Sequence, residues 1–131
     1  MSRNPSSQKF HDLLTVVGDM HDAKQKDYGT DADPFRNVRL SEELGIPGWA
    51  GSVLRMNDKQ VRLNKAVRDT LATGAPGLIH ESVQDNFIDK AVYALIGHVL
   101  YDEWEQARQA EIQQTHRLSD EFVKLNPEHT Q

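Results

Sequence analysis

The sequence predicts an all-α fold, a helical bundle of three to four main helices. Apolar residues recur at helical spacing in three long segments, and no segment alternates polar and apolar residues as a half-buried strand does. The prolines fall outside these three segments, where a break in a helix is tolerated. Amphipathic helices must bury their apolar sides against one another, so a helical bundle follows.

The first helix is predicted over residues 9–26. It should end at Tyr28 and Gly29, because glycine adopts the left-handed conformation that closes helices. Residues 1–8 are polar and are expected to be a flexible N-terminus. The apolar side of this helix is formed by Phe10, Leu13, Leu14, Val17 and Met20.

The next stretch, residues 29–48, is rich in glycine and proline and is predicted to be a loop with one helical turn at residues 41–44. A connection of this length in a compact domain is usually functional or mobile.

A second helix is predicted from Trp49 to about Thr73, with a break at residues 74–77 (GAPG). A third should start near Leu78 and continue toward Gln113. Its apolar residues surround much of its circumference, which predicts burial on several sides, including by a second subunit of a homo-oligomer. Residues 9–113 would then form the domain, and residues 114–131 a polar C-terminal tail that could hold one short helix before Pro127.

Composition limits the function classes. A chain of 131 residues suits one domain. The net charge of −5 argues against binding of a nucleic-acid polymer. The absence of cysteine excludes disulfides and thiolate metal sites, and no apolar run is long enough for a membrane span. No signal peptide is visible at the N-terminus, so a cytoplasmic location is expected.

Three acids in the third predicted helix are candidate metal ligands. Glu81, Asp85 and Asp89 are spaced by four residues, which places them within a sector of about 80° that becomes apolar further along the helix. Their mutual repulsion must be offset by lysine and arginine from another helix or by a divalent ion. Oxygen ligands alone suit Mg²⁺ or Mn²⁺ rather than zinc. The alternative is a solvated acidic edge with ordinary ion pairs.

One side of the second helix is strongly charged, with Arg55, Asp58, Lys59 and Arg62. If this side meets the third helix, Asp58 could join the metal ligands while the three cations bind phosphates. The alternative is an exposed face with ion pairs between successive helical turns. Further candidate substrate-binding residues are Lys26, Tyr28, Arg36 and Asn37.

Four segments together resemble the phage and bacterial nucleotide-modification-associated domain family: KDYG (residues 26–29), PFRN (34–37), RMNDKQVRL (55–63) and ESVQDNFIDKAVY (81–93). That family is similar to the MazG-like, all-α nucleoside triphosphate pyrophosphohydrolases. The resemblance covers about residues 9–100. It implies a helical, usually oligomeric fold that binds Mg²⁺ through helix carboxylates and cleaves a (d)NTP to the monophosphate and pyrophosphate.

Glu81 and Asp85 match the first and last acids of the MazG-type Glu-Glu-x-x-Asp run, which makes them the candidate catalytic residues. Ser82 stands where that run has its second glutamate, and the Glu-x-x-Glu pair of the preceding helix is missing, since Asp58 is the only acid of the segment RMNDKQVRL.

Three hypotheses follow. The first is a metal-dependent pyrophosphohydrolase in which Glu81 and Asp85, with Asp58 or Asp89, hold the metal. The second is a non-catalytic module that sequesters or senses a nucleotide, as the missing carboxylates suggest. The third is a structural oligomeric protein whose third helix is the interface.

Overall fold

The computed structural model describes residues 3–28 and 35–126, which form helices and their connections without any strand. In order, the elements are α1 (Pro5–Tyr28), α2 (Arg36–Arg39), the 3-10 helix η1 (Leu40–Leu44), α3 (Gly48–Thr73) and α4 (Val83–Leu125). The predicted all-α class is confirmed. Within this part of the chain, no helix is both long and apolar enough to cross a membrane.

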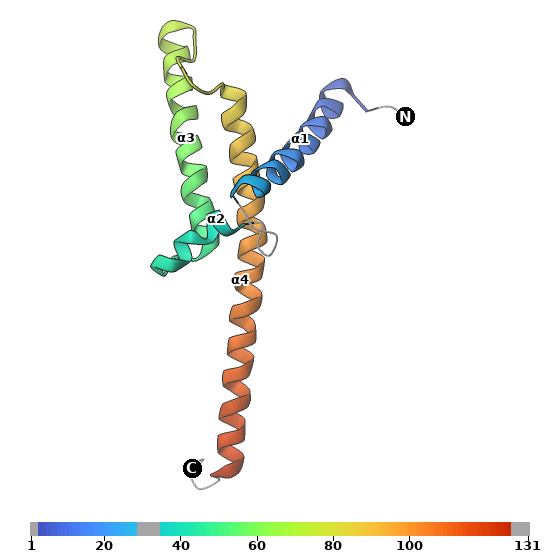
Figure 1. The fold of residues 1–131 in the computed structure, drawn as a ribbon, viewed down its shortest axis with the longest axis vertical. Coiled ribbons are helices and arrows are strands. Elements are labelled where there is room, and N and C mark those ends of the chain that lie inside the picture. Colours follow the sequence, from blue (N-terminus) through green and yellow to red (C-terminus); the bar gives the residue numbers. More distant parts are fainter. Residues whose placement is uncertain (1–2, 29–34, 127–131) are drawn as a thin grey trace.

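The centre of the fold is a hairpin of α3 and the first half of α4, which run antiparallel and side by side (Figure 1). Helix α3 ends at Gly74, whose φ of 81° is the left-handed conformation that a residue with a Cβ rarely adopts. Ser52 on α3 is fully buried, and a Cβ added to Gly97 on α4 would lie 3.2 Å from the Ser52 Cβ. Small residues at this crossing therefore allow the two helices to approach closely.

The buried core is small and centred on α4. Val92, Ile96 and Leu100, spaced by four residues, form one face of α4 and pack with Val17 of α1 and Val38 of α2. These contacts attach α1 and α2 to the hairpin. Elsewhere on α4, Phe87 and Leu95 are 60% and 56% exposed, so the predicted burial of this helix on several sides is not confirmed within the single chain.

The segment before α3 folds back onto it. Helices α2 and η1 both contact α3, and a Cβ added to Gly51 would lie 3.0 Å from the carbonyl oxygen of Val38. Glycine at this position therefore permits the close approach of α2 to α3. The predicted turn at residues 41–44 is present as part of η1, with α2 immediately before it.

Three helix ends differ from the predictions. Helix α1 begins at Pro5 rather than Lys9, because Asn4 accepts a hydrogen bond from the Ser6 backbone and proline suits the first helical position. Helix α4 begins at Val83 rather than near Leu78, because Ser82 caps it.

The largest difference lies at the end of α4. The helix continues without a break through the predicted tail to Leu125, since no proline interrupts it. Its distal half, residues 105–125, extends away from the hairpin as a single helix, and the N-terminal part of α1 also projects outward (Figure 1). The described chain is therefore extended rather than compact.

Candidate functional site

Charged side chains from α3 and α4 meet on one side of the hairpin. Lys59 Nζ lies 3.1 Å from Asp89 Oδ2 and 3.7 Å from Glu81 Oε2, and Arg62 Nη1 lies 2.9 Å from the same Glu81 oxygen. We call these four residues the seam cluster. Two predicted acids are thus brought together with two predicted cations, and the lysine and arginine of α3 offset the repulsion between the acids.

Exposure separates the two ion pairs of this cluster. The Lys59 and Asp89 side chains are 14% and 15% exposed to solvent, whereas those of Arg62 and Glu81 are 47% and 38% exposed. Removing one partner from a pair withdrawn from water leaves an uncompensated charge, whereas an exposed pair contributes less than about 1 kcal/mol. Lys59 and Asp89 therefore hold α3 and α4 together, and Arg62 can exchange its partner at little cost.

A pocket of about 290 Å³, which we call the seam pocket, adjoins the seam cluster between α3 and the segment that leads into α4. Arg62 and Lys65 lie on one side, where Lys65 Nζ is 2.5 Å from Asp69 Oδ2, and residues 77–80 form another. Asn86 also lines it. This side chain is fully buried; its Nδ2 donates to the Ser82 carbonyl oxygen, 2.9 Å away, while its Oδ1 has no hydrogen-bond partner.

Asp85 has a local structural role at the start of α4. Its backbone N–H donates to Ser82 Oγ over 3.0 Å, and its Oδ2 accepts from the Ser82 N–H over 3.2 Å, which is a capping box. The helix begins only after Ser82, so the predicted face of Glu81, Asp85 and Asp89 on one continuous helix is wrong for Glu81. Glu81 reaches the cluster from the preceding turn.

Arg55 and Asp58 are placed elsewhere. Both are exposed, and both line a separate hollow of about 320 Å³ beside η1, with Leu40 and Ser41. Lys59 and Arg62 each follow one of these two residues by four positions, so all four share one side of α3, and Arg55 and Asp58 lie one turn nearer its start, beside η1. Among the residues that the structure describes, no group of three or more histidine or carboxylate side chains could hold a metal ion.

Four predicted substrate-binding residues have side chains outside the described part of the structure. These are Lys26 and Tyr28 near the end of α1, and Arg36 and Asn37 at the start of α2.

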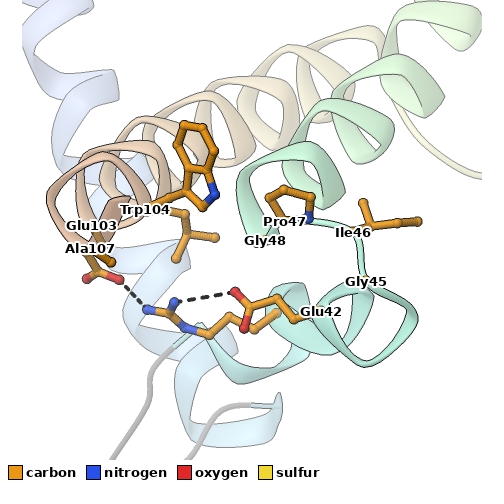
Figure 2. Close-up of a pocket in the computed structure, with 10 residues that line it drawn as sticks. Glu42, Gly45, Ile46, Pro47, Gly48, Glu103, Trp104 and Ala107 are labelled. Carbon is orange, nitrogen blue, oxygen red and sulfur yellow. Dashed lines mark hydrogen bonds and ion pairs between the residues drawn. The ribbon is translucent and has the colours of Figure 1, made fainter. Parts of the chain in front are cut away.

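A larger hollow, of about 460 Å³, lies at the opposite end of the hairpin, where α3 begins (Figure 2). Arg39 spans it, with Nη2 2.5 Å from Glu103 Oε2 and Nη1 3.8 Å from Glu42 Oε1. Trp104 forms one wall and packs edge-on against Trp49. Its single arginine is held by two acids, so this hollow offers little free charge to a ligand.

Sequence reasoning missed Lys65 and Asn86 of the seam pocket. Lys65 follows Arg62 by three residues and so lies on the same side of α3, a spacing that could have identified it. Asn86 carries a weaker signal, a carboxamide between apolar positions of a helix that is buried on several sides. Comparison with protein-family models, curated proteins and solved structures gives no match to the chain.

Proposed function

We propose that the chain binds a nucleoside triphosphate at the seam pocket. The observation that carries this proposal is the exposed Arg62, beside Lys65, at a pocket that is also lined by Asn86, whose buried Oδ1 has no hydrogen-bond partner. Phosphate oxygens would replace Glu81 as the partner of Arg62, since an arginine fork binds phosphate well and the exposed ion pair is weak.

Asn86 gives this pocket a hydrogen-bond acceptor, whereas Arg62 and Lys65 are hydrogen-bond donors. A buried carbonyl oxygen without a donor costs about 1–3 kcal/mol, which a ligand N–H could recover. Nucleobase edges offer such donors, so a base near Asn86 and phosphates near Arg62 and Lys65 would use both features. This arrangement agrees with the nucleotide chemistry that the family resemblance implies.

The second candidate function is metal-dependent pyrophosphohydrolysis of a (d)NTP, which the match of Glu81 and Asp85 to the MazG-type acids favours. The four proposed metal ligands do not fit one ion in the arrangement described. Asp85 caps α4, Asp58 lies beside η1, and Lys59 neutralises both Glu81 and Asp89. Binding of Mg²⁺ or Mn²⁺ would require these acids to leave their present partners, and we derive no catalytic step through a metal.

One experiment separates the two functions. The purified protein is titrated calorimetrically with a panel of NTPs and dNTPs, in EDTA and then with Mg²⁺ or Mn²⁺, and the products are separated by anion exchange. Saturable binding with the triphosphate intact supports the binding module, and a monophosphate that forms only with metal supports the hydrolase. If no nucleotide binds under any condition, both proposals fail.

A further inference from the structure

The chain exposes more surface than a compact monomer of its size. A folded protein of 14.9 kDa is expected to expose about 7,000 Å², whereas this chain exposes 10080 Å². An obligate homodimer removes about 1,000–2,500 Å² from each partner, so a second copy would account for most of the excess of about 3,000 Å². This comparison is independent of the proposed function.

Part of this surface is an apolar groove at the tip of the hairpin, which we call the tip groove. It has a volume of about 240 Å³ and lies between the end of α3 and the start of α4. Val67, Leu71 and Phe87 are 59%, 84% and 60% exposed there. The groove is lined by Leu63, Ala66, Val67, Thr70, Leu71, Val83 and Phe87.

The distal half of α4 is the other apolar surface. All of its residues except Glu105 are exposed, although an isolated helix of this length is only marginally stable in water. Leu118 and Leu125, seven residues apart, lie on one side of it and are 54% and 81% exposed. This side continues the stripe of Val92, Ile96 and Leu100 that is buried nearer the start of α4.

The lengths and the positions of these two surfaces match. Residues 105–125 span about 31 Å, and residues 83–104, which α3 covers, span about 33 Å. If two copies are related by a twofold axis near Trp104 with their α4 helices antiparallel, each distal half lies along the partner's hairpin. Leu125 then lies level with Val83 along the helix axis, and Leu118 lies within one helical turn of Phe87. Val123, on the same side of α4 as Phe87, also lies within one turn of that residue.

We propose that the chain forms an antiparallel, twofold-symmetric homodimer in which the distal half of α4 of each copy fills the tip groove of the other. The same pair of surfaces is used twice, so the assembly closes at two copies and leaves neither surface exposed. The distal half then has a packing partner over its whole length.

The absence of cysteine from the chain allows a clean cross-linking test. Phe87→Cys and Val123→Cys are introduced together in the full chain, which is then oxidised. The two positions lie on the same side of α4 but about 54 Å apart along it, so a disulfide can form only between copies. We expect a covalent dimer on a non-reducing gel. The matched control, Phe87→Cys with Lys124→Cys, turns the second thiol by about 100° and should cross-link far less.

Two further measurements decide the arrangement. Light scattering of the wild-type chain should give twice the chain mass. Leu118→Glu should raise the dimer dissociation constant at least 100-fold with an unchanged helical CD spectrum, while Gln113→Glu, on the other side of the helix, should not. A monomeric wild-type chain overturns the proposal. So does a disulfide formed by Leu118→Cys alone, because those two thiols would meet only in a parallel dimer.

Discussion

At the scale of single residues, Lys59 is the centre of the seam cluster. It is the only residue of the cluster that contacts two acids from the α4 side, and its side chain and that of Asp89 are largely withdrawn from water. A charge in that environment depends on its partner far more than an exposed charge does. The structural and ligand-binding roles of the cluster are therefore divided between Lys59, which joins the helices, and Arg62, which faces solvent.

This division predicts the outcome of a double-mutant cycle. Lys59→Gln and Asp89→Asn should each lower the free energy of unfolding by about 1–3 kcal/mol, because each removes the shorter ion pair of a largely buried charge. The double variant should lose less than the sum. In the matched cycle, Arg62→Gln and Glu81→Gln should each cost less than about 1 kcal/mol. Urea unfolding followed by CD measures both cycles; equal, additive losses in both would refute the division.

At the scale of secondary-structure elements, the start of α4 determines where the acids lie. The hydroxyl of Ser82 caps the helix. The Asp85 carboxylate accepts a hydrogen bond from the Ser82 N–H and is thereby engaged in the capping box. Ser82 therefore sets both the helix boundary and the partner of one of the acids.

Removal of the cap tests this account. Ser82→Ala should lower the free energy of unfolding by about 1 kcal/mol, since the Asp85 N–H loses its acceptor at the helix N-terminus. Ser119→Ala, at an exposed position inside α4, serves as the control and should have a much smaller effect. Thermal or urea unfolding of the two variants measures the difference, and equal stabilities would show that the capping box contributes nothing.

The sequence predicted α3 almost to the residue, because Pro47 before it and Gly74 after it mark its ends. It predicted too short an α4, since polar residues after Gln113 suggested a tail although glutamate, glutamine, alanine and arginine all favour helix. For the site, helical spacing identified charged sides of two helices. It could not show that Lys59 and Arg62 pair with Asp89 and Glu81 while Arg55 and Asp58, one turn earlier on the same side, lie beside η1, because that depends on how the elements pack.

At the scale of the whole molecule, the buried core is too small for the surface that the chain presents. Five buried residues form the central cluster, whereas large apolar side chains are exposed along all the long helices. The hydrophobic effect provides most of the driving force for folding, so a fold with this distribution gains stability when a second copy covers it.

The dimer predicts a concentration-dependent melting temperature. A tenfold increase in protein concentration should raise the Tm of the wild-type chain by about 3 °C or more, because association stabilises only the folded state. Leu118→Glu should melt at a lower temperature that does not change with concentration. Differential scanning calorimetry over a hundredfold concentration range measures this dependence, and a constant wild-type Tm would contradict it.

The central functional claim is that the seam pocket binds triphosphate through Arg62 and Lys65. The most direct test is calorimetric titration, in EDTA, of the best-binding triphosphate into the wild-type chain and into two variants. Arg62→Gln with Lys65→Gln should weaken binding about 10- to 100-fold, since two charged hydrogen-bond donors to phosphate are lost. Arg68→Gln, which removes a cation from the same helix outside the pocket, should bind as the wild-type chain does. Equal affinity in all three proteins would contradict the assignment of the site.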